Sequence, residues 1–285
     1  IDESGGLDIG EISQPLMTMQ FMPNIDGTLN AGYTEEVYWI RFEAENASAE
    51  KTWLLEAAAS TLDSLTLYAQ QGDGSYEAVE SGSAVPAAKR VYYHRNFVFP
   101  LDVPGGASRT FYLRAQTDGQ MQLPMAIWDE KAFEANTRTT TALIGLAAGV
   151  LAVLLAYQFV QFARLRQLGY LYFGLMAVAL LATVSSLAGL TLTFIWPDLV
   201  WWNERSILLF IGLSSIFLLL FTANFLDTRR HLPRIKKGLQ LLILLHLPLL
   251  AVVLVSMEAV KHLLPFLLLV FSAVVFALFL LSPKV

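Results

Sequence analysis

Long apolar runs dominate the chain from Thr141 onward, and short charged loops separate them. Each run approaches the roughly 20 residues that an α-helix needs to cross a hydrocarbon core of about 30 Å. Backbone groups in lipid must find their partners within the helix, so such runs favour membrane spans. The pattern predicts an all-α polytopic transmembrane bundle over residues 141–285, with spans at about 141–162, 169–190, 207–225, 239–257 and 263–281.

The first half alternates between apolar and polar positions over short stretches, which is typical of half-buried β-strands. Turn residues such as Gly72-Asp73-Gly74 and Pro104-Gly105-Gly106 separate these stretches. We therefore expect an all-β sandwich of the jelly-roll type over residues 1–128, with a helical linker at 129–140. The predicted strands are 36–44, 52–58, 63–70, 90–100, 109–117 and 121–128.

Composition supports a two-part chain. Of the 285 residues, 55% are hydrophobic, and the mean hydropathy of +0.52 exceeds that of an ordinary soluble domain. Residues 1–140 carry nine Lys/Arg and twenty Asp/Glu (9 − 20 = −11), whereas the remainder carries ten and four (10 − 4 = +6). There is no cysteine, so disulfides, catalytic thiols and thiolate metal sites are excluded.

Lys and Arg in the short loops predict the orientation, because such residues stay on the cytoplasmic side. The first loop contains Arg164 and Arg166, and the third, 227–237, is strongly basic; the second and fourth are nearly neutral. The first and third loops should face the cytoplasm. This places the N-terminal domain outside and the C-terminus inside.

A ligand-binding face is suggested by an aromatic–arginine step that occurs on three of the predicted strands. If the steps share one sheet face, the rings could stack on a sugar while the guanidinium groups bind its oxygens. The competing interpretation is a solvated face on which aromatic rings pack against arginine stems. The candidate residues are Trp39, Arg41, Tyr93, Arg95, Tyr112 and Arg114.

Other candidates lie in the predicted membrane domain. His246 is an ionisable group within the fourth span, either a functional contact or a neutral imidazole bonded within the bundle. Gly145 and Gly149 form a GxxxG pattern that fits close helix packing, with a homodimer seam as one option. No clustered metal ligands and no nucleotide or catalytic motif occur. We therefore expect no cofactor, no enzymatic activity within this chain and no nucleic-acid partner.

Several segments together resemble one bacterial family, the seven-transmembrane receptors with diverse intracellular signalling modules. The soluble half is similar to their type 2 extracellular domain, and the resemblance continues through the apolar half. It rests on 37–42 (VYWIRF), 53–56 (WLLE), 90–99 (RVYYHRNFVF), 111–114 (FYLR), 145–149 (GLAAG), 169–173 (GYLYF), 196–198 (WPD) and 225–230 (FLDTRR).

The resemblance implies a periplasmic jelly roll similar to carbohydrate-binding modules, followed by a receptor membrane domain. In this family a cytoplasmic kinase, cyclase or phosphatase usually follows. The chain departs from that pattern because it has five predicted spans and no output module. Both departures fit a chain truncated before the sixth span.

We therefore expect a multi-pass sensor of the bacterial inner membrane, surrounded by membrane lipids. Its outer domain would bind a small, carbohydrate-like ligand or a protein and signal to a cytoplasmic module. The main alternative is a transport or assembly subunit whose outer domain docks a partner. Transport is disfavoured by the scarcity of polar residues at mid-membrane.

Overall fold

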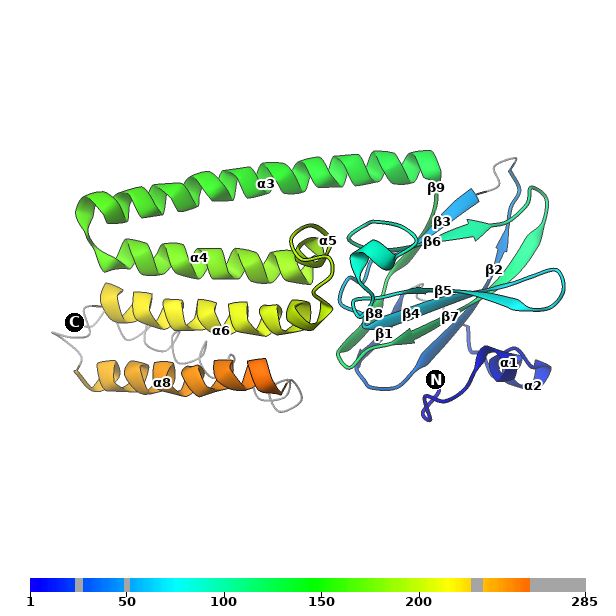
Figure 1. Cartoon of the computed structure of the whole chain (residues 1–285), viewed down its shortest axis with the longest axis horizontal. Helices are drawn as coiled ribbons and strands as arrows, with labels where there is room; N and C mark the ends of the chain where they lie inside the picture. Colours follow the sequence, from blue (N-terminus) through cyan, green and yellow to red (C-terminus); the bar gives the residue numbers. More distant parts are fainter. Residues whose placement is uncertain (24–27, 49–51, 227–232, 257–285) are drawn as a thin grey trace. The chain divides into compact units, whose positions relative to one another are not determined.

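A computed structural model of the chain describes residues 1–23, 28–48, 52–226 and 233–256. The chain divides into two compact units (Figure 1). The first contains Ile1–Thr141 together with Leu187–Val200, and the second contains 142–186 and the described chain from Trp201 onward. The segment Leu187–Val200 joins two apolar helices but belongs to the unit that holds the β-strands.

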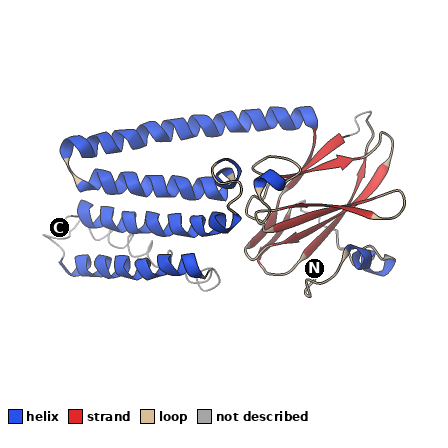
Figure 2. Cartoon of the chain, viewed as in Figure 1, coloured by secondary structure: helices blue, strands red, loops and turns tan. Residues whose placement is uncertain are grey.

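The described residues of the first unit form three antiparallel sheets, and the long apolar helices follow the strands along the chain (Figure 2). One sheet has the order β2-β7-β4-β5, with β2 (Tyr38–Glu45), β7 (Ser108–Gln116), β4 (Ser64–Gln70) and β5 (Tyr76–Ser81). A second has the order β6-β3-β9, with β6 (Phe97–Asp102), β3 (Thr52–Ala57) and β9 (Met125–Asp129). A two-stranded sheet pairs β1 (Leu29–Tyr33) with β8 (Gln120–Leu123).

The core of the sandwich lies between the inward faces of these sheets. Phe99, Phe111 and Leu113 are fully buried in it, and Tyr38, Ile40 and Phe42 pack against it, as the alternation predicts. Burying this apolar surface is the main source of stability in a chain without disulfides. The predicted fold class, an all-β sandwich followed by a helical membrane region, is confirmed.

The N-terminal residues form two short helices that the apolar pattern does not predict. They are α1 (Ile9–Ile12) and α2 (Pro15–Thr18). A capping box starts α1: Asp8 accepts from the Glu11 amide, and the Glu11 carboxylate accepts from the Asp8 amide. A 3-10 turn, η1 (Ala87–Lys89), precedes β6.

Four described helices are long and apolar enough to span a membrane. They belong to α3 (Glu130–Leu165), α4 (Leu168–Leu187), α6 (Val200–Phe225) and α8 (Pro233–Val255), with the short α5 (Leu190–Phe194) after α4. The predicted linker and the first span form one uninterrupted helix, α3. The second predicted span, 169–190, ends earlier than expected because Gly189 takes a left-handed φ of +72°. The fifth predicted span lies outside the described residues.

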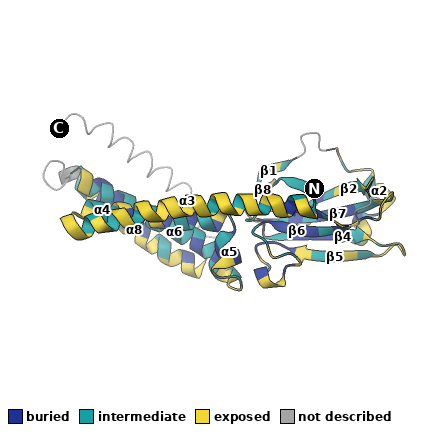
Figure 3. Cartoon of the chain, turned by 90° about the horizontal axis from the view of Figure 1, so that it is seen from above, coloured by how far each residue is buried: buried dark blue, intermediate teal, exposed yellow. Residues whose placement is uncertain are grey.

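Buried apolar residues join α6 and α8 in the helical unit. Leu219 and Leu239 are buried against each other, and Val253 is buried among Leu208, Leu209 and Ile211. The most apolar window of α3, in contrast, contains no buried residue (Figure 3). This face of α3 is therefore suited to contact lipid or other membrane helices.

Candidate functional site

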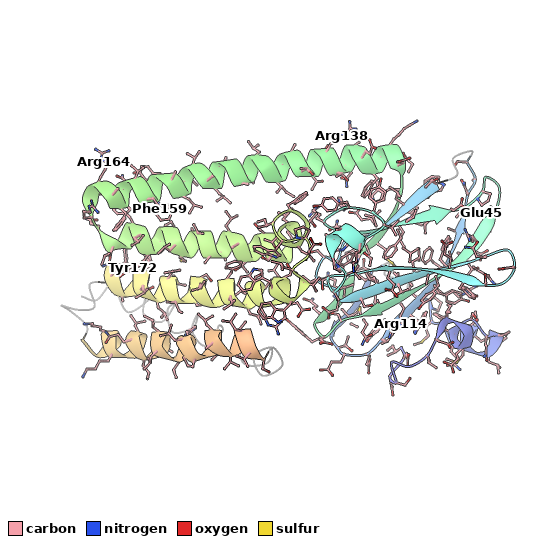
Figure 4. The ribbon with its side chains drawn as sticks, viewed as in Figure 1. Glu45, Arg114, Arg138, Phe159, Arg164 and Tyr172 are labelled. Atoms are coloured by element: carbon pink, nitrogen blue, oxygen red, sulfur yellow. The ribbon has the colours of Figure 1, made fainter. Side chains whose placement is uncertain are left out.

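Four of the six predicted ligand residues lie on the outer face of one sheet. In the β2–β7 register, Trp39 pairs with Arg114 and Arg41 pairs with Tyr112. In both pairs, the aromatic ring of one strand therefore lies beside the arginine of the neighbouring strand. Figure 4 labels Arg114 on this sheet.

The two rings of this face are nevertheless not open to solvent. Trp39 is 8% exposed and Tyr112 is 4% exposed. Ile12 is buried with them, and Leu7, Ile9, Met17 and Phe21 pack around them. The N-terminal segment, residues 1–22, thus covers the part of the face on which a ligand would stack.

Tyr93 and Arg95 lie outside the strands, so the condition that the three steps share one sheet face is not met. The expected strand 90–100 begins only at Phe97, and residues 91–96 are irregular. Residues 91–96 are called the junction segment below.

One side of the junction segment contacts the root of α3. The rings of Tyr92 and His94 lie edge-on to Phe133, with centroids 5.8 and 5.1 Å apart. Phe133, in the first turn of α3, is 2% exposed and packs with Leu54 and Val98 of the sandwich. The first membrane helix therefore starts from a fixed position on the sheet β6-β3-β9.

A buried carboxylate holds this side of the junction segment. Glu56 is 7% exposed and accepts from Asn96 Nδ2 at 2.6 Å and from Trp128 Nε1 at 2.9 Å. Two donors on a buried carboxylate offset part of its desolvation cost. Because Glu56 is on β3 and Trp128 is on β9, these two hydrogen bonds connect the junction segment to both strands.

The other side of the junction segment contacts the loop between α4 and α6. The Tyr93 hydroxyl donates to the Thr193 carbonyl, and its ring lies 6.2 Å from that of Phe194. A Cβ placed on Gly189 would be 2.7 Å from the Arg95 carbonyl oxygen and 2.8 Å from Ser60 Cβ. Only glycine therefore fits this approach.

Two further hydrogen bonds attach the same loop to the sandwich. Ser60 Oγ donates to the Leu187 carbonyl at 2.8 Å, and the Ala87 amide donates to the Pro197 carbonyl at 3.0 Å. Arg90 supports the Ala87 turn by donating to the carbonyls of Val85 and Gly82. Burial lowers the pKa of Arg90 to about 10, so it remains a cation at neutral pH.

His94 is the group of the junction segment that titrates nearest to neutral pH. Desolvation lowers its pKa below 6.5, opposed by the nearby Glu56 carboxylate and reinforced by Arg95. Its Nδ1 accepts from the Asn96 amide at 3.1 Å, which fixes the proton on Nε2 when the ring is neutral. The neutral form is therefore favoured in the folded domain.

The remaining candidates lie on the apolar helices. His246 on α8 is 5% exposed, with Nδ1 2.8 Å from the Leu242 carbonyl oxygen, one turn earlier on the same helix. No atom lies within 4 Å of a Cβ placed on Gly145 or Gly149 within the described residues. No group of three or more His, Cys, Asp or Glu that could hold a metal occurs in the part of the chain that the structure describes.

Two residues of the sequence mark the junction. Glu56 is a lone charge in the strand Thr52–Ala57, which indicates a buried polar contact. Gly189 interrupts the second apolar run, which indicates a break in the helix. Neither signal names its partner, since the partners are distant in the chain.

An outer β domain attached to membrane helices by a fixed helix root and a docked loop is the architecture of a multi-pass membrane receptor. The chain belongs to the family described as 7TM diverse intracellular signalling, which matches residues 140–284. Residues 1–129 match the domain described as 7TMR-DISM extracellular 2. No curated protein gave a significant match. The resemblance noted from the sequence is confirmed, and the protein is a membrane signalling receptor with an outer N-terminal domain.

Proposed function

We propose that the outer domain binds a small ligand or a protein and that the junction segment passes the change to the membrane helices. The receptor would sit in a bacterial inner membrane, with its sandwich in the periplasm and its C-terminal side toward the cytoplasm. A cytoplasmic signalling module would receive the output. The basic first and third loops support this orientation.

The observation that carries the proposal is the alternation of contacts along the junction segment. Tyr92, His94 and Asn96 contact the α3 root and Glu56, while Tyr93 and the Arg95 backbone meet the α4–α6 loop. A movement of the junction segment would therefore act on the α3 root and on the α4–α6 loop at once. Signalling requires that the ligand bind the two receptor states with different affinity.

The proposal is tested by locking the loop onto the sandwich. The chain has no native cysteine, so Ala87→Cys with Pro197→Cys provides a single defined pair. Residues joined by a backbone hydrogen bond of 3.0 Å lie close enough for a disulfide, whose Cα atoms are about 4.4–6.8 Å apart. Ala78→Cys on β5 with Pro197→Cys is the control pair.

The readout is backbone hydrogen exchange of the full chain in lipid nanodiscs. The oxidised protein is compared with the reduced protein. We expect the Ala87/Pro197 pair to cross-link and to change exchange at the far ends of α3 and α6, near Leu165 and Phe225. The Ala78 pair should do neither. A disulfide that forms fully and leaves every membrane helix unchanged would contradict transmission through the loop.

A further inference from the structure

The outer face of the sheet β2-β7-β4-β5 is aromatic, although such a face in an antiparallel sheet usually meets water. The rings of Trp39 and Tyr68 stack with centroids 5.5 Å apart. Tyr76 lies edge-on to Tyr112 at 5.8 Å. Arg41, which is exposed, and Arg114 adjoin these rings. The combination suits a flat apolar ligand that carries oxygen acceptors.

The N-terminal segment covers this face with two helices of four residues each. Helices of one turn have almost no stability of their own, so their position depends on tertiary contacts. Phe21 contacts Tyr112 edge-on at 6.2 Å, and Ile12 is 4% exposed. On the solvent side of the segment, Leu16 and Met19 are 77% and 82% exposed.

The cover fits the face incompletely. Trp39 Nε1 is buried and has no hydrogen-bond partner among the residues that the structure describes. A native structure rarely leaves a buried donor unpaired, because its lost hydration is not replaced. A cavity of about 290 Å³ also remains beside Trp39, lined by Leu7, Ile12, Met17 and Phe21 among others. The segment therefore leaves both a donor and a space that another molecule could fill.

A clamp at one end holds the cover in place. The Asp2 carboxylate accepts from Ser4 Oγ at 2.6 Å and from the amides of Ser4, Gly5 and Leu7 at 3.1, 2.9 and 3.0 Å. The Asp2 backbone pairs with that of Val37, two residues before Trp39. Arg114 adds a bond to the Gly5 carbonyl at 3.3 Å.

We propose that residues 1–22 are a displaceable cover over a ligand site formed by Trp39, Tyr68, Tyr112, Arg41 and Arg114. The ligand is a neutral molecule with a flat apolar face and oxygen acceptors, one of which takes the Trp39 indole N–H. The net charge of −11 on residues 1–140 disfavours an anion, and the guanidinium groups of Arg41 and Arg114 disfavour a cation, so a neutral ligand is expected. The proposal rests on the receptor function above and supplies its ligand site and ligand class.

The cover is tested with Asp2→Ala in the full chain in nanodiscs. Asp73→Ala is the matched control, because Asp73 makes the same turn with Ser75, accepting from its amide at 2.9 Å and its hydroxyl at 2.6 Å. Indole ¹⁵N labelling gives one N–H signal per tryptophan, and Trp39→Phe identifies the signal of Trp39. Signals of Trp53 and Trp128 verify that the sandwich stays folded.

We expect Asp2→Ala to speed solvent exchange of the Trp39 N–H about tenfold, and Asp73→Ala to leave it unchanged. Ile12→Ala, which removes a buried anchor of the cover, should act in the same direction. Equal Trp39 exchange in the wild type, Asp2→Ala and Ile12→Ala would overturn the cover.

Two probes distinguish sources of the ligand chemistry: methyl β-D-glucopyranoside for a sugar and acetophenone for an aryl ketone. At least one should bind Asp2→Ala about tenfold more tightly than the wild type, since an open site need not first displace the cover. Binding that is weaker in Asp2→Ala, or absent for both probes, would overturn the ligand site. The disulfide test of the loop does not involve the cover, so each proposal can fail alone.

Discussion

Gly189 is the residue on which docking of the α4–α6 loop depends most directly. Its left-handed φ and its approach to Ser60 and Arg95 both exclude a Cβ. Gly189→Ala should therefore loosen the loop and speed exchange of the Ala87 amide about tenfold, measured by hydrogen exchange. Gly72→Ala, where no atom of the described residues lies within 4 Å of the added Cβ, is the control. Equal exchange in both variants would contradict the close approach.

His94 makes the junction segment sensitive to acid. Its pKa is lower in the folded domain than in the unfolded chain, mainly through desolvation. The unfolded chain then binds more protons, so the stability this ring contributes is present above pH 6.5 and is lost as pH falls through the folded pKa.

The expected result is lower thermal stability of the outer domain at pH 5 than at pH 7. His94→Gln, which cannot titrate, should remove part of that difference. The measurement is the melting temperature of both proteins across this range. If His94→Gln shows the full wild-type pH dependence, other groups account for it.

Residues 91–96 do not form the predicted strand, yet their side chains still alternate between two sides. Alternation depends only on an extended backbone, so Tyr92, His94 and Asn96 separate from Tyr93 and Arg95 even outside a ladder. Sequence could not predict the burial of Trp39 and Tyr112. Their cover comes from residues 1–22, which carry too few apolar positions to form a recognisable element.

Among the elements, β3 carries Glu56, which bonds Asn96 of the junction segment and Trp128 of the paired strand β9. Glu56→Ala leaves the Asn96 and Trp128 donors without their acceptor. We expect the outer domain to lose about 1–3 kcal/mol of unfolding free energy, measured by urea unfolding. Glu80→Ala on the exposed face of β5 serves as the control and should change stability little. Comparable losses in the two variants would remove the special role of Glu56.

The predicted elements agree with the structure where one spacing of apolar positions continues along the segment. They differ where a single residue or a distant contact decides where the element begins or ends. Strands β2 and β7 follow their alternation closely, and α3, α4, α6 and α8 fall on the apolar runs. Gly189 ends α4 early, and residues of 91–96 contact Glu56, Phe133 and Thr193 instead of extending β6. Such contacts join positions far apart in the chain, so no local pattern contains them.

For the whole molecule, the charge distribution predicts which side of the membrane each part occupies. Gly72 lies in the β4–β5 turn of the outer domain, and Gln167 lies in the first basic loop. In intact cells a membrane-impermeant maleimide should label Gly72→Cys and not Gln167→Cys; permeabilised cells should label both. Labelling of both variants in intact cells would contradict the orientation.

We infer that the α3 root and the α4–α6 loop are coupled through the junction segment. Phe133 packs against Tyr92 and His94, whereas the loop meets Tyr93 on the other side. The loop amides of Ile195 and Trp196 both donate to the Thr191 carbonyl, at 2.9 Å each, and report loop order.

Hydrogen exchange of these two amides in Phe133→Ala tests the coupling most directly. We expect both amides to exchange about tenfold faster than in the wild type. Leu146→Ala, a change at an exposed apolar position of the same helix, should leave both amides unaffected. Unchanged exchange of Ile195 and Trp196 in a folded Phe133→Ala protein would contradict the coupling.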